Sequence, residues 1–382
     1  MLYGTPELDP ADKAVLGEIE DMRRDLKYRL AESHRWDGQL RRQLQARAIQ
    51  GSNTIEGYRA SVEDIESIML GEDPLETTPA VAGEIAGYQQ ALTYIRHLSL
   101  ARSFRFDTGM LHALNFMMIG HHHDKTPGTP RPGGIYVRNS ATGEVVYEGP
   151  DAEAVPALLD ELTEWLNGGD LDVPGYVRAA MAHLNLVKIH PWRDGNGRMS
   201  RALQTLVLGR DQITLPEFSS IEEWLGEGRT TYDYYDVLGE IGRKRWSPHD
   251  ETLPWVRFCL RAHHMQAQRV RRRLAEAGEV WLLLEEQVDK ERLHPRCVSA
   301  LYQVFVSRRL RRGTYQADES LSQGQAARDL RELAARDWLT PYGETKGRFY
   351  APGPKMERVK GEFAARVEPL RDPYRPGSGR TP

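Results

Sequence analysis

The segment HPWRDGNGRMSR, residues 190–201, places two glycines around an asparagine, immediately before a stretch with helical periodicity. Gly195, Asn196 and Gly197 are therefore predicted to form the entry to a helix. Backbone N–H groups at such a point face outward together, and the helix dipole adds positive potential. The triplet indicates a site for an anion such as a phosphate group.

Charged side chains on both sides of the triplet extend this interpretation. Arg198 and Arg201 are three residues apart and share one face of the helix, so two guanidinium groups reach the same anion. Asp194 offers one hard oxygen ligand, which suits Mg²⁺ carried by phosphates. His190 is the nearby side chain that exchanges a proton near neutral pH. A glycine-rich turn between two helices would explain the glycines, but not the base, the acid and the two arginines.

The whole segment resembles the Fic motif, HxFx(D/E)GNGRxxR, with Trp192 at the position where the family usually has phenylalanine. The resemblance covers roughly residues 80–260, with looser similarity on both sides. It implies a mainly α fold, in which a Fic helical core carries a β-hairpin flap. Tryptophan and phenylalanine are both large aromatic residues that can anchor the loop, so we expect the loop to keep its conformation with Trp192.

The resemblance also implies a role for each residue of the motif. His190 would deprotonate a Ser, Thr or Tyr hydroxyl of a target protein, which would attack the α-phosphorus of ATP and release pyrophosphate. Asp194 would hold Mg²⁺, and residues 195–197 would bind the α- and β-phosphates through backbone N–H groups and the asparagine amide. Arg198 would hold the γ-phosphate and Arg201 would support the β-phosphate. The intact triplet argues against the kinase-like Doc branch.

A second segment, SNTIEG at residues 52–57, carries little meaning alone, since a serine and a glutamate on a helix are usually solvated. Beside a Fic loop it resembles the inhibitory motif (S/T)xxxE(G/N), with Ser52, Glu56 and Gly57 at the matching positions. In that class the glutamate pairs with the first arginine of the loop. The resemblance therefore implies an ion pair between Glu56 and Arg198 that keeps ATP from binding productively.

The composition is that of a soluble globular protein, with 40% hydrophobic residues and a net charge of -4, which gives the chain no overall affinity for nucleic acid. Residues 293–382 differ, because they hold 17 basic and 10 acidic residues and so indicate a separate module. The two cysteines, Cys259 and Cys297, predict no disulfide framework and a reduced, cytoplasmic compartment. No signal peptide or apolar run long enough for a membrane span is expected.

The resemblance, together with glycine, proline and helical periodicity, implies five parts of the chain. These are an N-terminal helical region (1–79), the Fic core (80–260), a helical linker (261–292), a winged-helix-like unit (293–355) and a tail (356–382) whose end is predicted to be disordered. Helices are expected over 11–50, 61–71, 82–101, 106–119, 151–168, 174–189, 198–208 and 220–285, with a break at Gly51–Ser52 and an N-cap at Ser61. Pro174 is suited to the start of its helix, and the helix over 151–168 has one apolar stripe of Leu158, Leu159, Leu162 and Leu166.

Two β-type runs around a polar turn at residues 141–143 predict a hairpin at 135–148, where Fic proteins carry the flap that docks their targets. An exposed flap strand would pair with an extended segment of a target protein. Tyr234 and Tyr235 fall where related proteins have tyrosines near the adenine. We expect Tyr234 to contact the adenine, with two core tyrosines as the alternative.

The C-terminal unit shows helices followed by a hairpin at 338–351, an order typical of a winged helix. Its predicted core consists of Leu321, Ala326, Leu330 and Leu333, and its predicted outward face of Ser322, Gln323, Gln325 and Arg328. Positive charge for DNA phosphates would come from Arg308, Arg309, Arg311, Arg312, Lys346 and Arg348. Because the third helix also carries acids, a protein-binding or homodimer module stays open beside DNA binding.

Two other functions are compatible with the same residues. The fold could remove AMP from a protein, with Glu56 positioning a water, or transfer another nucleotide or phospho-group. Alternatively, the chain could be a DNA-binding regulator whose Fic core senses a nucleotide. The run His121–Asp124 is interpreted as a polar loop rather than as a metal site.

Overall fold

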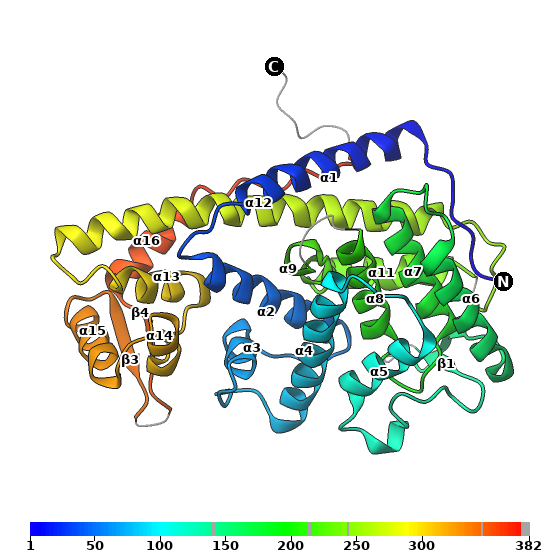
Figure 1. The fold of residues 1–382 in the computed structure, drawn as a ribbon, viewed down its shortest axis with the longest axis horizontal. Coiled ribbons are helices and arrows are strands. Elements are labelled where there is room, and N and C mark those ends of the chain that lie inside the picture. The colour runs from blue at the N-terminus through cyan, green and yellow to red at the C-terminus, as the bar shows by residue number, and fades with distance from the viewer. Residues whose placement is uncertain (139–141, 212–215, 243, 345–346, 376–382) are drawn as a thin grey trace.

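The computed structural model describes residues 1–138, 142–211, 216–242, 244–344 and 347–375. The structure is mainly α-helical, as predicted. One long helix, α12 (Leu253–Lys290), runs the length of the molecule, and α1 (Pro10–Arg29) lies along it (Figure 1). The helices around the loop 190–201 lie at one end of α12, and the C-terminal unit lies at the other.

The remaining elements follow in chain order. They are α2 (Asp37–Ile55), α3 (Val62–Met69), α4 (Pro79–Leu100), α5 (Thr108–Ile119), η1 (His123–Lys125), β1 (Tyr136–Arg138), β2 (Val145–Glu148), η2 (Ala152–Ala154), α6 (Val155–Gly168), α7 (Gly175–Ile189), α8 (Asn196–Arg210), α9 (Pro216–Ser219), α10 (Glu222–Leu225), α11 (Arg229–Glu240), α13 (Cys297–Ser307), α14 (Arg312–Asp318), α15 (Gln323–Ala335), β3 (Leu339–Tyr342), β4 (Phe349–Pro352) and α16 (Pro354–Ala364).

The N-terminal helices differ from the prediction at two points. The expected helix over 11–50 is two helices, because the chain turns between Arg29 and Asp37. The expected break at Gly51–Ser52 is absent, since α2 continues to Ile55. Gly51 serves packing instead: a Cβ there would lie 2.1 Å from the carbonyl oxygen of Glu222. The glycine lets α2 approach the backbone of α10 closely.

Several local predictions are confirmed. Ser61 caps α3, with its hydroxyl accepting the N–H of Asp64 at 3.1 Å. The hairpin of β1 and β2 is antiparallel, with Tyr136 opposite Glu148, although Ala141 of its turn lies outside the described residues. The leucine stripe of α6 is buried, and consists of Leu158, Leu159, Leu162 and Leu166.

Two hydrophobic cores meet along α2. Ala46, Ile49 and Ile55 of this helix pack into the core around α4, α7 and α8. Leu40 and Leu44 pack into the second core, with the far half of α12 and the C-terminal unit. Polar contacts add to the second interface, since the side chain of Gln43 donates to the carbonyl of Val306 at 2.6 Å. Helix α2 is therefore shared between both cores.

The C-terminal unit has the predicted order of three helices and a hairpin. Tyr350 of β4 also pairs with Leu310, between α13 and α14, in an antiparallel bridge. Ala326, Leu330 and Leu333 are fully buried and Leu321 packs against them, as expected. The assignment to a winged helix stays a prediction.

The tail differs from its prediction. Its first part continues as α16, which the sequence analysis assigned to no element. Residues 369–375 return to α1 and α12: Arg261 pairs with Asp372 at 2.7 Å, and the Tyr374 hydroxyl donates to Asp12 at 3.0 Å. Residues 376–382, which belong to the end predicted to be disordered, lie outside the described residues.

Candidate active site

The loop 190–201 leaves α7 at His190, whose backbone is left-handed at φ 51°, and enters α8 at Asn196. Trp192 is fully buried beneath it, and its indole N–H donates to Nδ1 of His112 at 3.1 Å. The expectation that Trp192 lies under the loop as a buried aromatic residue is confirmed. His112 belongs to α5 and is a supporting residue that the sequence analysis missed.

The side chain of Asn196 holds the loop closed. Its Oδ1 accepts the N–H of Trp192 at 3.0 Å, and its Nδ2 donates to the carbonyl of the same residue at 2.8 Å. The amide was expected to bind phosphate, but both of its ends are used within the loop. The backbone N–H of Asn196 belongs to the first turn of α8, whose N–H groups have no partner within the helix.

The ring of His190 is held in one orientation. Its Nδ1 lies 3.1 Å from the carbonyl oxygen of Val187, so Nδ1 carries the proton and Nε2 keeps the lone pair. Burial lowers the pKa of His190 to about 4, and the nearby charge of Arg131 acts in the same direction. Arg131 also fixes the backbone, since its Nε donates to the carbonyl of His190 at 2.9 Å. The imidazole is therefore neutral near pH 7 and able to accept a proton at Nε2.

The entry to α8 has the shape of an anion site. Gly195 is left-handed at φ 78°, and the N–H groups of the first helical turn have no partner within the helix. A Cβ on Gly197 would lie 2.4 Å from Oε1 of Glu56. The carboxylate of Glu56 therefore lies directly against the place where the helix entry favours a negative charge.

Glu56 pairs with Arg201, not with Arg198. Oε1 of Glu56 accepts Nη2 of Arg201 at 2.7 Å, and Arg201 also donates to the hydroxyl of Ser52 at 2.8 Å. The predicted pair with Arg198 is wrong because Ser52 and Glu56 lie one turn apart on α2, and that face of the helix meets the second arginine of the loop. Gly57 follows in a left-handed conformation at φ 89°, which ends α2 directly after Glu56.

Arg198 forms an ion pair with a different acidic residue. Its Nη1 donates to Oε2 of Glu84 at 2.6 Å, and both side chains are buried. The guanidinium also lies 5.4 Å from the ring centre of Tyr58, which follows the segment 52–57. Glu84 comes from α4, and no spacing in the sequence connects it with the loop. Tyr58 could have been considered from the sequence, since it directly follows SNTIEG.

The residues fit a polyphosphate carrying Mg²⁺. Nε of Arg198 and Nη1 of Arg201 are buried and have no hydrogen-bond partner, so each has a free donor for an anion. Asp194 is partly exposed beside them, and its Oδ1 accepts the N–H of Gly195 at 2.6 Å. Its other carboxylate oxygen is the one suited to a metal ion.

The two tyrosines of α11 differ in exposure. Tyr234 is 1% exposed, and its hydroxyl lies 3.0 Å from Nε2 of His183 inside the core. This burial contradicts the predicted contact with adenine. Tyr235 is 48% exposed, and its hydroxyl donates to the carbonyl of Ile55, the neighbour of Glu56, at 2.8 Å. Tyr235 is thus the tyrosine of the pair that a nucleotide could reach.

The hairpin is tied to the active-site loop. The hydroxyl of Tyr147 donates to the carbonyl of Lys188, two residues before His190, at 2.6 Å. A Cβ on Gly149 would lie 3.8 Å from the Cβ of His190. Tyr136 on β1 is 52% exposed. The hairpin therefore places an exposed strand close to His190.

A match to a family of known proteins agrees with this geometry. The family model described as Fic/DOC matches residues 105–208, which include α5, the hairpin and the whole loop 190–201. Residues 105–208 are a Fic/DOC family domain. The matched residues thus include His190, the entry of α8 and both arginines, whereas Glu56 and Glu84 precede them in the chain.

Curated relatives match a larger part of the chain. A protein adenylyltransferase Fic of Nematostella vectensis is 24% identical over 264 residues, which cover 67% of this chain and 55% of that protein. A protein adenylyltransferase Fic of Drosophila melanogaster is 33% identical over 256 residues, covering 63% and 45%. The chain spans about half the length of these relatives.

Solved structures share the fold beyond the Fic domain. A Fic family protein from Desulfovibrio desulfuricans G20 superposes with a TM-score of 0.58 at 22% identity, covering 92% of this chain and 98% of that one. Fic-1 of C. elegans gives a TM-score of 0.56 at 21% identity, covering 70% and 73%. The first likeness extends the shared fold to nearly the whole chain.

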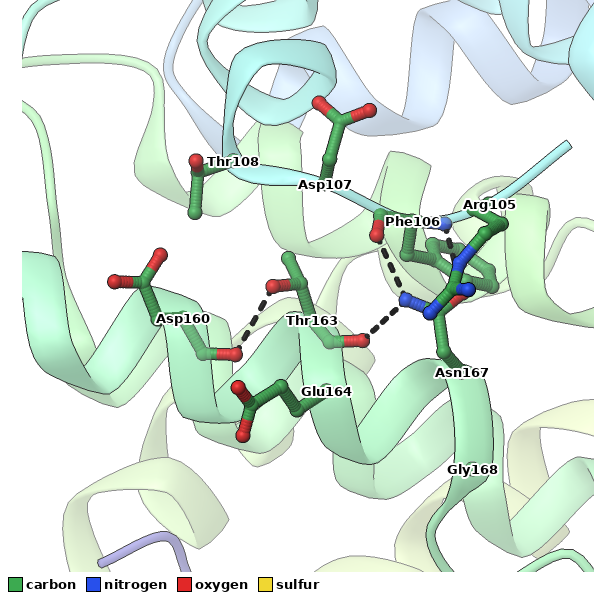
Figure 2. A pocket seen from close by; sticks show the side chains of 9 residues that line it. All are labelled: Arg105, Phe106, Asp107, Thr108, Asp160, Thr163, Glu164, Asn167 and Gly168. Carbon is green, nitrogen blue, oxygen red and sulfur yellow. Dashed lines mark hydrogen bonds between the residues drawn. The ribbon is translucent and has the colours of Figure 1, made fainter.

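Another depression, of about 560 Å³, shares no residue with the loop 190–201 (Figure 2). It lies between the start of α5 and α6, and Asn167 closes it by bonding both backbone groups of Phe106, at 3.0 and 2.7 Å. Its acids, such as Asp160 and Glu164, face it without the paired arginines of the Fic site. Its lining holds one arginine, Arg105, beside three acids.

The charges of the C-terminal unit are largely used inside the protein. Arg308 pairs with Glu357 at 2.8 Å, and Arg309 pairs with Asp64 at 2.6 Å. Arg311 pairs with Glu72 at 3.4 Å, while Lys346 lies outside the described residues. Three of the six predicted phosphate ligands thus already have carboxylate partners.

Within the described ranges, no helix is long and apolar enough to pass through a bilayer.

Proposed function

We propose that this chain transfers AMP from ATP to a hydroxyl side chain of a target protein, and that Glu56 holds it in a resting state. The observation that carries the proposal is the position of the Glu56 carboxylate. It binds Arg201 and lies against Gly197, where an anion is favoured, within the same site as a neutral histidine. The names of the matching relatives support the same chemistry.

In the proposed reaction, Nε2 of His190 takes the proton of a Ser, Thr or Tyr hydroxyl as its oxygen attacks the α-phosphorus of ATP. The bond between the α-phosphorus and its bridging oxygen breaks, and pyrophosphate leaves. The N–H groups at the entry of α8 hold the oxygens of the α- and β-phosphates. Arg201 supports the β-phosphate and Arg198 the γ-phosphate. The rate gain comes from positioning and from fixed positive charge.

Mg²⁺, held by Asp194, would neutralise phosphate charge when bound. Tyr235 takes the place first expected for Tyr234 at the adenine. The target is proposed to lie along the strand Tyr136–Arg138, so that its backbone extends the hairpin and its hydroxyl comes to His190. A cytoplasmic location fits the two cysteines of the described chain, which are both free and buried.

The carboxylate of Glu56 accounts for the proposed resting state in two ways, through the guanidinium that it occupies and through its negative charge. Glu56 takes the guanidinium that the phosphates need, and its own negative charge repels them. The backbone of the same segment also positions Tyr58 over Arg198. Both arginines are thus in contact with residues 56–58.

The test is incorporation of label from ATP labelled at the α-phosphate, with Mg²⁺, into the protein itself and into added cell protein. Three forms are compared: the wild type, Glu56→Gly and Glu56→Gly/His190→Ala. We expect label with Glu56→Gly, little with the wild type and none with the double variant.

Two results would change the proposal. Equal labelling by the wild type and Glu56→Gly would remove Glu56 as the restraint but keep the transferase. Release of AMP from pre-modified protein by the wild type, without any transfer, would assign the site to the reverse reaction.

A further inference from the structure

Three metal-ligating side chains meet beside Arg198, outside the proposed catalytic machinery. Oε1 of Glu84 lies 3.3 Å from Nε2 of His121, and Nε2 of His122 is hydrogen-bonded to the same oxygen. The three ligand atoms lie within 4.8 Å of one another. The sequence interpretation of this histidine run as a polar loop missed Glu84, which is distant in the chain.

The spacing suits a shared ion. A tetrahedral zinc ion with bonds of about 2.0 Å has neighbouring ligand atoms about 3.3 Å apart. The contact between His121 and Glu84 already has that length. His122 lies closer to the same oxygen and would have to draw back, and its side chain is 34% exposed and so has room to do so.

The backbone behind the cluster is fixed. A Cβ on Gly87 of α4 would lie 2.3 Å from the carbonyl oxygen of Met118 on α5, so the two helices touch at this point. Glu84 lies one turn before Gly87, and the two histidines follow directly on the end of α5. The ligands are therefore supplied by closely packed elements rather than by a long loop.

We propose that Glu84, His121 and His122 bind a divalent transition-metal ion of the Zn²⁺ class. Two imidazoles and one carboxylate form a ligand set that selects such ions over Mg²⁺. Three protein ligands leave a position open for water or a phosphate oxygen. The histidine side chains are about one-third exposed, at 33% and 34%, so the ion has a path to the site.

The site has a direct connection with Arg198. The second oxygen of Glu84, Oε2, is the partner of Arg198, so one carboxylate is shared between the ion and the arginine. An ion there adds positive charge next to the guanidinium that the proposed function assigns to the γ-phosphate. The site itself does not depend on that function and is separate from the Mg²⁺ ligand Asp194.

The experiment uses full-length, tag-free protein stripped with a chelator and titrated with Co²⁺ at pH 7.5, followed by the visible absorption of protein-bound Co²⁺. The variant is His121→Gln/His122→Gln, and the matched control is His123→Gln, the next residue in the run. We expect the wild type and His123→Gln to bind one equivalent that Zn²⁺ displaces and excess Mg²⁺ does not. The double variant should lose affinity by more than about 100-fold, beyond what changes in outer-shell residues cause.

Melting curves of the metal-free proteins verify that each variant is folded. If the double variant does not fold, His121→Gln alone should still weaken binding by at least about tenfold. The proposal is overturned if the wild type gives no Co²⁺ absorption, if Mg²⁺ removes it, or if the histidine variants bind as the wild type does.

Discussion

Arg201 donates to Oε1 of Glu56 at 2.7 Å, and the arginine is 1% exposed whereas the glutamate is 27% exposed. Burial alone would lower the pKa of Arg201, but the charge of Glu56 raises it above its ordinary value. The guanidinium is also held by the hydroxyl and carbonyl of Ser52. Removing the glutamate therefore frees one face of the arginine while Ser52 keeps it in place.

This arrangement predicts that Glu56→Gln strengthens ATP binding by at least about tenfold, because glutamine keeps the shape and removes the repelling charge. Calorimetric titration with ATP and Mg²⁺, in the His190→Ala background so that no turnover occurs, measures the change. Glu76→Gln, at an exposed position, is the matched control and should bind as the parent does. An unchanged dissociation constant for Glu56→Gln would show that the carboxylate does not compete with phosphate.

The low pKa of His190, about 4, predicts a flat pH profile. A base acts in its deprotonated form, so His190 keeps its lone pair between pH 8 and 5.5, whereas an ordinary histidine loses it around 6.5. Loss of the Glu56 charge lowers the pKa further. The initial labelling rate of Glu56→Gly at saturating ATP should hence stay constant over this range. A decline centred near pH 6.5 would mean that the acting base is solvent-exposed.

Gly51→Ala tests the close contact of α2 with α10. The added methyl would overlap the carbonyl of Glu222, so α2 has to shift, and the free energy of unfolding should fall by about 1–3 kcal/mol. Gly38→Ala, in the same helix with open space around it, should be neutral or stabilising by up to about 1 kcal/mol. Denaturant unfolding gives both values. Because Glu56 directly follows α2, the shift should also raise the incorporation of label from ATP in Gly51→Ala. Equal free energies of unfolding for the two variants would refute the contact.

Trp192→Phe restores the aromatic residue that the motif usually carries and removes the hydrogen bond to His112. We expect a loss of about 1–2 kcal/mol in the free energy of unfolding, from the bond and the space left by the indole. The labelling rate in the Glu56→Gly background should stay within about twofold, because Asn196 still closes the loop. A large loss of rate with little loss of stability would instead make the indole a positioning group.

Local sequence patterns predicted much of this fold. The N-cap at Ser61, the leucine stripe of α6 and the start of α7 after Pro174 all depend on nearby residues, and the structure contains each of them. The failure at Gly51 has a tertiary cause, because only the approach of α10 shows why a glycine stands inside a helix. Helix α16 was missed because the proline-rich end of the tail dominated the interpretation of that region.

In the candidate site, too, the features that depend on nearby residues were predicted, and those that depend on tertiary contacts were not. Residues of one continuous motif were predicted together, because twelve consecutive positions fix their own geometry. The partners of the two arginines come from α2 and α4, and their assignment depends on how those helices rotate about their axes. Sequence spacing carries no information on that rotation, so Glu56 was paired with the wrong arginine and Glu84 was not found. Tyr234 and Tyr235 were likewise indistinguishable until the direction of α11 was known.

Helix α2, which ends at Ile55 directly before Glu56 and has Leu40 and Leu44 in the second core, is shared by the two ends of the molecule. A ligand of the C-terminal unit that favours a displaced α2 would change the affinity for ATP by some factor. By reciprocity, ATP would change the affinity for that ligand by the same factor. The C-terminal unit would then respond to nucleotide without touching it, and the strength of the response could be measured from either side.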